Sequence, residues 1–197
     1  MTKLVGYPPQ INYYRRGVCL DNVVSIPSNN TSLYDSTLLQ GFRSRIFPES
    51  HCLSLSEASA HSPRVLYIPR GSARNGRCLA NENEVIQYLQ NYNLTVFDPG
   101  QHALDIQQET FNSADIVVGV HGSAMLNLFY MKPNRFVIEL SSCLYDPVHD
   151  YILASMMSVT LLRVRCASLG NNTSSNLFCD LSKLHRALQL VAKNAYL

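Results

Sequence analysis

The sequence lacks several features that would place it in a common functional class. It has no apolar run of about 18 residues or more, so no membrane span is predicted. The first residues contain no apolar stretch like the core of a signal peptide, so we expect either no secretion signal or a natural N-terminus that lies elsewhere. The net charge of +2 is too small to favour nucleic acid or an anionic membrane as the main partner. What remains is a foldable composition, 46% hydrophobic and 15% charged.

The six cysteines form no CxxC pair, so no zinc cluster is expected. Cys166 and Cys179 flank a polar loop rich in turn-forming residues. In an oxidising compartment a disulfide could close this loop, and the alternative is two free buried thiols. Asn-x-Ser/Thr sequons favour a lumenal protein. They begin at Asn29, Asn30, Asn93, Asn171 and Asn172.

The chain changes character near residue 63. Residues 1–62 are rich in Pro, Asn, Ser and Tyr and are predicted to form an irregular N-terminal extension, with short strands over 18–27 and a helix over 35–47. From residue 64, short apolar strands alternate with helical patterns. The predicted strands are 65–69, 94–99, 115–120, 135–140 and 160–166, and the predicted helices are 81–92, 103–114, 123–131, 146–158 and 180–195.

Strands that are apolar on both sides and alternate with helices are typical of a parallel sheet with βαβ crossovers. The sequence therefore predicts an α/β fold over 63–197, with a Rossmann-like sheet of about five strands and helices on both faces. Ligands of such sheets bind at the carboxyl ends of the strands. Polar residues that follow a strand are the first place to look for a site.

The third predicted strand ends at His121, Gly122 and Ser123. Glycine permits a tight turn and a close backbone approach, and the free N–H groups of the following helix favour an anion such as phosphate. In the alternative interpretation the glycine only makes a turn, His121 caps a strand, and Ser123 caps the helix. The segment is not a GxSxG nucleophile elbow, because Ser123 is its last residue rather than its centre.

The loop after the first strand is the second candidate site. Arg70 ends the strand, Arg74 and Arg77 follow in a Gly/Ser/Asn-rich segment, and the next helix opens near Asn81. Arginines bind phosphate oxygens through a two-pronged guanidinium, so these residues could clamp a diphosphate. The alternative is a solvated basic loop. No GxGxxG and no GxxxxGK[ST] occurs, so neither a dinucleotide fingerprint nor a P-loop is indicated.

Glu139 ends the fourth strand at the same edge and could accept hydrogen bonds from ribose hydroxyls. The alternative is a salt bridge to Arg70 or Arg77. Asn127 lies one turn into the short helix, where we expect a packing or backbone role.

The order and spacing of these residues resemble glycosyltransferase family 61. The resemblance rests on Arg70 and Arg77 followed by "NENE" at 81–84, then "VHGSAMLN" at 120–127, then "VIEL" at 137–140. It is best over 64–166 and extends loosely over about 15–196. The family includes the EGF-domain O-linked N-acetylglucosaminyltransferase, the O-mannose N-acetylglucosaminyltransferase and plant xylan xylosyl- and arabinosyltransferases.

The resemblance implies an inverting enzyme of two facing Rossmann-like domains (GT-B type), of which this chain is the C-terminal, donor-binding half. It implies a UDP-sugar donor, a glycan or protein acceptor, no catalytic metal and no other cofactor, and an ER or Golgi lumenal setting. Arg70 with Arg74 or Arg77 would hold the diphosphate, the turn at His121, Gly122 and Ser123 would approach the nucleotide, and Glu139 would lie near the ribose or sugar. The catalytic base is not identified, and a truncated or non-catalytic nucleotide-sugar-binding module is the alternative.

Overall fold

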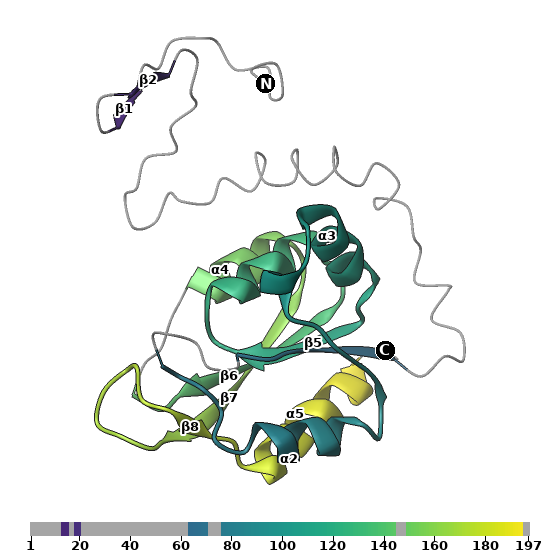
Figure 1. Cartoon of the computed structure of the whole chain (residues 1–197). Helices are drawn as coiled ribbons and strands as arrows, with labels where there is room; N and C mark the ends of the chain where they lie inside the picture. The colour runs from purple at the N-terminus through teal and green to yellow at the C-terminus, as the bar shows by residue number, and fades with distance from the viewer. Residues whose placement is uncertain (1–12, 16–17, 21–62, 71–75, 145–148, 195–197) are drawn as a thin grey trace. The chain divides into compact units, whose positions relative to one another are not determined.

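The computed structural model describes residues 13–15, 18–20, 63–70, 76–144 and 149–194 (Figure 1). Internal contacts divide the chain into two compact units, Met1–His51 and Cys52–Leu197. In the first unit, strand β1 (Tyr13–Arg15) pairs antiparallel with β2 (Val18–Leu20). The predicted helix over 35–47 lies outside the described residues.

The second unit contains the alternating pattern that the sequence predicts. Its elements are β3 (Arg64–Ile68), α2 (Glu82–Leu89), β4 (Asn93–Val96), η2 (Pro99–Gln101), α3 (Leu104–Ser113), β5 (Ile116–Val120), η3 (Ser123–Tyr130), β6 (Phe136–Ser142), α4 (His149–Met156), β7 (Thr160–Ser168), β8 (Leu177–Phe178) and α5 (Leu181–Asn194). The five predicted strands correspond to β3 through β7. The predicted short helix after β5 is a 3₁₀ helix, η3.

The sheet has six strands rather than about five, in the order β4-β3-β5-β6-β7-β8. The first five are parallel to one another, and β8 is antiparallel to β7. The sequence pattern missed β8 because it has only two residues, too few to show a period. The structure is therefore a mixed α/β fold around a mostly parallel sheet.

The strand order shows where this sheet can bind a ligand. β4 lies on one side of β3, and the chain then crosses back to place β5 on the other side. This is the 2-1-3-4-5 order of doubly wound sheets, whose ligands bind at the carboxyl ends of the strands where the winding direction reverses. That switch point lies between the carboxyl ends of β3 and β5, after Ile68 and Val120.

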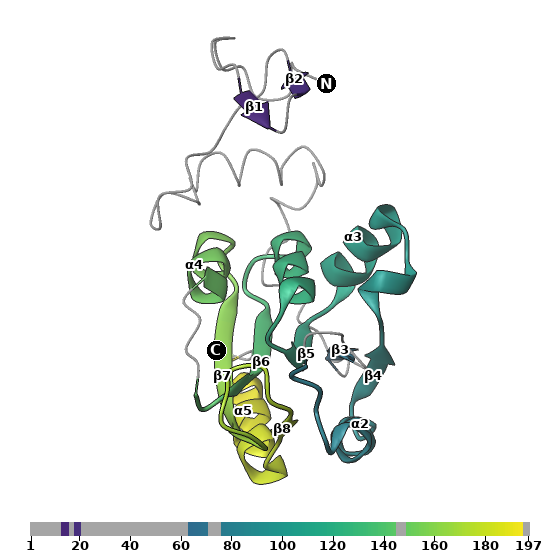
Figure 2. The same ribbon diagram turned by 60° about the vertical axis from the view of Figure 1, so that its left-hand side comes forward.

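Helices cover both faces of the sheet. Figures 1 and 2 show α2 and α5 on one face and α3 and α4 on the other, and η3 contacts both α3 and α4. Because side chains alternate along a strand, Val118 faces α2 and α5, whereas a side chain at Gly119 would point at Met125 of η3. All five residues of β5 are buried, which explains its continuous apolar sequence.

Helix α3 packs against the core over only part of its length. In its sequence, Leu104, Ile106, Thr110 and Phe111 fall only roughly on one face. Phe111 is fully buried, but Leu104 and Ile106 are 57% and 43% exposed. The apolar pattern of this helix was irregular, and only its C-terminal half packs against the core.

The loop between Cys166 and Cys179 contacts the segment before α2, where Ser174 accepts the N–H of Arg77 and Asn176 accepts the N–H of Cys78. Both cysteines are buried thiols, and a hydrogen bond that the Cys166 thiol donates to Cys179, together with burial, raises the pKa of Cys166. This contact is compatible with either sequence-based alternative. The disulfide remains a proposal, which the mass of the unreduced protein would test.

Candidate functional site

A pocket of about 470 Å³ opens at the switch point of the sheet. Its volume is within the usual range for small-molecule sites. It is lined by residues that follow β3 and β4 and by the 3₁₀ helix after β5. They are Pro69 and Arg70, residues 98–100, Gln107 of α3, and Ser123, Ala124 and Asn127 of η3. Two of the predicted binding residues, Arg70 and Ser123, therefore contribute to its wall.

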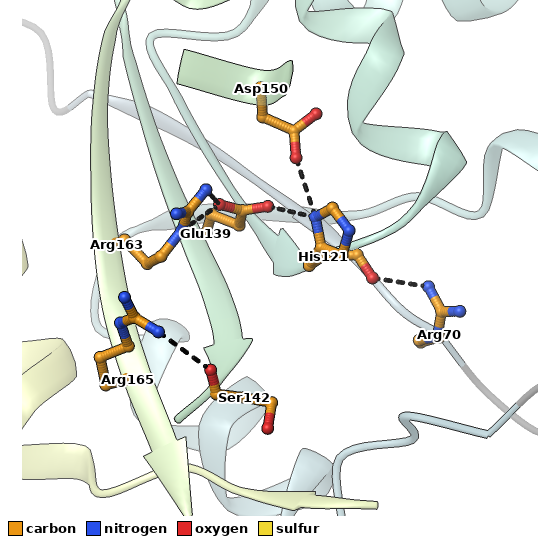
Figure 3. A network of polar contacts seen from close by, with 7 residues as sticks. All are labelled: Arg70, His121, Glu139, Ser142, Asp150, Arg163 and Arg165. Atoms are coloured by element: carbon orange, nitrogen blue, oxygen red, sulfur yellow. Dashed lines mark hydrogen bonds and ion pairs between the residues drawn. The ribbon is translucent and has the colours of Figure 1, made fainter. Parts of the chain in front are cut away.

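Arg70 joins the ends of the two strands that flank the switch point. Its Nη1 donates to the carbonyl oxygen of His121 at 2.8 Å (Figure 3). Its Nε donates to the carbonyl oxygen of Gly76 at 3.1 Å. Its backbone N–H donates to Glu82 at 3.2 Å. The guanidinium thus lines the pocket and also holds the turn after β5 in place.

Gly122 has a specific steric reason to be glycine. A Cβ at this position would lie 2.0 Å from Nη1 of Arg70, so any other residue would displace the guanidinium. The sequence predicted a close approach at Gly122, and the group that approaches is this arginine. Gly122 is also the N-cap of η3, and Ser123 is the first residue of that helix rather than its cap.

Arg77 has an unusual backbone conformation and an unpartnered polar atom. Its φ is 62°, a value that non-glycine residues adopt rarely, and its backbone N–H donates to Ser174 at 3.0 Å. Its Nε is buried and has no hydrogen-bond partner among the residues that the structure describes. Burial, followed by the charge of Arg77, lowers the pKa of Arg70, so the two cations act on each other. Arg74 lies outside the described residues.

Asn81, a predicted binding residue, is buried, and its side chain contacts Cys179, just before α5. Its side-chain Nδ2 donates to the carbonyl oxygen of Cys179 at 2.8 Å, and its Oδ1 accepts the N–H of Cys179 at 3.0 Å. The side-chain amide therefore pairs with both backbone groups of Cys179, as a neighbouring strand would, and connects the start of α2 to the start of α5. Asn81 is not among the residues that line the pocket.

The side chain of His121 turns away from Arg70 into a buried ionic cluster, which consists of His121, Glu139, Asp150 and Arg163 (Figure 3). Nδ1 of His121 lies 2.6 Å from Glu139 and 2.8 Å from Asp150. Arg163 donates to Glu139 through Nε at 2.7 Å and Nη2 at 2.6 Å. The sequence considered Arg70 or Arg77 as the partner of Glu139, but the partner is Arg163 on the neighbouring strand.

The sheet register creates this cluster. Glu139 is directly opposite Gly119 on one side and Arg163 on the other, so all three lie on the same face of the sheet. Gly119 has no side chain to fill the space beside the carboxylate. Asp150 reaches the cluster from the first turn of α4, and the guanidinium of Arg163 stacks 4.2 Å above the ring of Tyr151.

The cluster changes the protonation of its members. Burial lowers the pKa of His121, but hydrogen bonds to Asp150 and Glu139 outweigh it and raise the pKa to about 9. Burial raises the pKa of Glu139, against the effects of His121 and Arg163. Burial opposes ionisation of Asp150 too, but hydrogen bonds from His121 and Glu139 lower its pKa. At neutral pH the imidazole is therefore a cation and Asp150 is ionised, so His121 is poorly suited to act as a base.

Ligand atoms of His121, Glu139 and Asp150 lie within 4.8 Å of one another, close enough to hold a metal ion. These atoms are already hydrogen-bonded to one another, and Arg163 supplies positive charge to Glu139. A divalent cation would have to displace the imidazolium proton and compete with that arginine. The donor set therefore fits an ion-pair network better than a metal centre.

Sequence reasoning missed four polar residues at this edge of the sheet. Asp98 and Gln107 line the pocket, and Asp150 and Arg163 complete the buried cluster. Arg163 gave the clearest signal, because a charged residue within an apolar strand needs a buried partner. Asp98 gave a second signal, because it is a charged residue near the carboxyl end of the predicted strand 94–99.

The fold defines a doubly wound α/β protein with a pocket at the carboxyl edge of its sheet. The sequence model of the glycosyltransferase 61 family matches residues 7–138 of this chain. The chain belongs to glycosyltransferase family 61. This membership points to glycosyl transfer as its activity. The match includes Arg70, Arg77 and the turn after β5, and it ends one residue before Glu139. No curated protein matches the chain significantly.

Proposed function

We propose that this chain binds a UDP-sugar as the donor half of an inverting, GT-B-type glycosyltransferase, for transfer of N-acetylglucosamine or a pentose to a glycan or protein hydroxyl. The observation that carries the proposal is Arg70 in the lining of the switch-point pocket, with Arg77 as a second cation close enough to lower its pKa. Among the described residues, Nε of Arg77 is buried and has no hydrogen-bond partner. A diphosphate would supply that partner and offset the repulsion between the two cations.

In this proposal the chain's main chemical task is to stabilise the leaving group. An acceptor hydroxyl attacks the anomeric carbon from the face opposite the diphosphate, and the bond from that carbon to the diphosphate oxygen breaks. Arg70 and Arg77 stabilise the negative charge that develops on the departing UDP. The N-terminal N–H groups of η3, at Ser123, face the same edge. Because the arginines supply the positive charge, the proposal requires no metal and no other cofactor.

Other predicted residues have supporting positions. Arg70 donates to the backbone carbonyl of His121, next to Gly122. Glu139 pairs with Arg163 and Asn81 pairs with Cys179, so both have structural roles near the pocket. The base that removes the acceptor's proton is not assigned. Family membership and the sequons support a lumenal setting in the secretory pathway as part of the proposal. Within the described ranges, no helix is long and apolar enough to cross a membrane.

The proposal is tested by isothermal titration calorimetry of UDP with the whole chain and an Arg77→Ala variant. Loss of one charge-assisted contact to the diphosphate should weaken UDP binding about tenfold or more. Arg186→Ala, on the exposed side of α5, is the matched control and should bind like the original chain. Unchanged UDP affinity in Arg77→Ala would refute the clamp.

Nucleotide-sugar binding without turnover is the second candidate. It is favoured by the burial of Glu139 and Asp150, because both carboxylates are paired within the ionic cluster and are poorly placed to accept an acceptor's proton. Release of free sugar or a glycosylated product from UDP-N-acetylglucosamine or UDP-xylose distinguishes the candidates. Binding with neither product would identify a binding module.

A further inference from the structure

The pocket lining also contains polar groups that the predicted clamp does not use, Asp98, Gln107 and Asn127. Asp98 follows β4, the strand next to β3 on the outer side of the switch point. Its Oδ1 accepts the backbone N–H of Gly100 at 3.0 Å, which fixes the carboxylate over the first turn of η2. A carboxylate at the ligand edge can accept hydrogen bonds from ribose hydroxyls, as an acidic residue does in dinucleotide-binding Rossmann domains.

Two amide side chains form a directed chain of hydrogen bonds beside Asp98. Nε2 of Gln107 donates to the carbonyl oxygen of His102 at 2.9 Å. A carbonyl can only accept, so the amide of Gln107 must turn its Oε1 the other way, where it accepts from Nδ2 of Asn127 at 3.1 Å. One N–H of the Asn127 amide is used by Gln107, and the Oδ1 of Asn127, on the other side of the same amide, is a hydrogen-bond acceptor.

His102, whose carbonyl oxygen begins this series of hydrogen bonds, is itself held by two contacts. The ring of His102 stacks on buried Phe97 at a centroid distance of 4.4 Å, and its backbone N–H donates to Pro99 at 3.2 Å. The carbonyl that orients Gln107 is therefore held in place, and the orientation passes on to Asn127. Sequence reasoning expected only a packing or backbone role for Asn127, because a single position cannot reveal a relay that spans three elements.

We infer that Asp98 and Asn127, the latter oriented by Gln107, form an acceptor wall, that is, a part of the pocket lining whose side-chain oxygens accept hydrogen bonds from the ligand. Asp98 accepts from the ribose hydroxyls, and Asn127 accepts from the N3–H of a uracil base. The pocket lining thus combines a cation, Arg70, with acceptor oxygens of Asp98 and Asn127, which matches a nucleoside diphosphate with an intact ribose. This inference rests on the proposed function, since it assumes that the anion at Arg70 is the diphosphate of UDP.

The test compares three ligands by calorimetry: UDP, 2′-deoxy-UDP and 3-methyl-UDP. Each analogue lacks one donor, so each should bind the original chain about five- to tenfold more weakly than UDP. Asp98→Asn keeps the bond to Gly100 but removes the carboxylate, and it should reduce discrimination against 2′-deoxy-UDP to less than about threefold. Asn127→Ala should do the same for 3-methyl-UDP only.

Gln107 is a positioning residue, and its effect is measured separately, as the discrimination between UDP and 3-methyl-UDP. Gln107→Met keeps the side-chain length but frees the amide of Asn127, so discrimination against 3-methyl-UDP should fall while discrimination against 2′-deoxy-UDP stays. Gln108→Met, one residue along α3 and outside the pocket lining, is the matched control and should change neither ratio.

Selective loss of discrimination supports the acceptor wall. If the variants weaken binding of all three ligands by the same factor, or leave both ratios unchanged, the wall does not read these donors and the inference is overturned while UDP binding stands. If UDP does not bind the original chain at all, the proposed function falls and the inference falls with it.

Discussion

At the scale of single residues, His121 contributes two separate groups to two separate interactions. Its carbonyl oxygen accepts from Arg70 at the pocket, and its ring contacts Glu139 and Asp150 behind the sheet edge. The buried cluster can therefore influence the pocket through the position of one backbone carbonyl. This arrangement makes the ring a structural cation rather than a proton acceptor.

The pH dependence of stability should report that cation. The pKa of His121 is raised from 6.5 to about 9, so folding favours its protonated form. The resulting stabilisation is fully present below about pH 6.5 and is lost as the pH rises through about 9, with up to about 3 kcal/mol involved. Urea unfolding of the original chain should show this decline, and His121→Asn should be nearly flat over the same range.

His149→Asn, which removes an exposed histidine at the start of α4, is the control and should follow the original curve. Parallel curves for the original chain and His121→Asn between pH 6.5 and 9 would contradict a stabilising imidazolium in the cluster.

At the scale of elements, the loop before α2 is held by the far end of the chain. Arg77 N–H donates to Ser174, Ala80 N–H donates to Leu177, and the amide of Asn81 pairs with both backbone groups of Cys179. A Cβ on Gly76 would lie 2.0 Å from the carbonyl oxygen of Ser174, so this contact also requires glycine. The position of the proposed clamp thus depends on the β7–β8–α5 region.

Replacing Asn81 should loosen this attachment. Asn81→Ala leaves the N–H and carbonyl of Cys179 unpaired in a buried position, which should cost about 1–3 kcal/mol of unfolding free energy in urea titration. The control is Asn91→Ala, whose amide donates to a carbonyl on an exposed helix end and which should cost less than about 1 kcal/mol. Equal losses of unfolding free energy in the two variants would contradict a stabilising role for the pairing of Asn81 with Cys179.

At the scale of the whole molecule, one edge of the sheet concentrates most of the polar groups discussed above. The strand order places the ends of β3, β4 and β5 around one pocket, and helices exclude water from the sheet on both faces. A ligand bound there contacts segments from residue 69 to residue 127. It should therefore stabilise this unit against unfolding as a whole.

Thermal unfolding should show this coupling. UDP at about 100 times its dissociation constant adds about 2.7 kcal/mol, which corresponds to a rise in Tm of about 5–10 °C for a chain of this size. GDP and CMP, used as controls, should give smaller shifts. Equal shifts for all three nucleotides, or none, would contradict a uridine-selective pocket.

Much of this architecture could be predicted from local pattern. Continuous apolar strands such as β5, separated by amphipathic segments, are sufficient for a parallel α/β sheet, and polar residues directly after strands indicate the ligand edge. Arg70 and Ser123 were found this way, and both line the pocket. The short strand β8 and the exposed first turn of α3 could not be predicted, because neither has a clear period.

The sequence by itself determined the fold class, the family and the edge where chemistry is concentrated, since these depend on periodicity and on the order of short motifs. Only the tertiary structure decided which polar groups meet. The pairing of Glu139 with Arg163, the grip of Arg70 on His121 and the relay from His102 to Asn127 all join residues from different elements. Such contacts depend on strand register and on helix placement, which are set by packing of the whole core rather than by neighbouring residues.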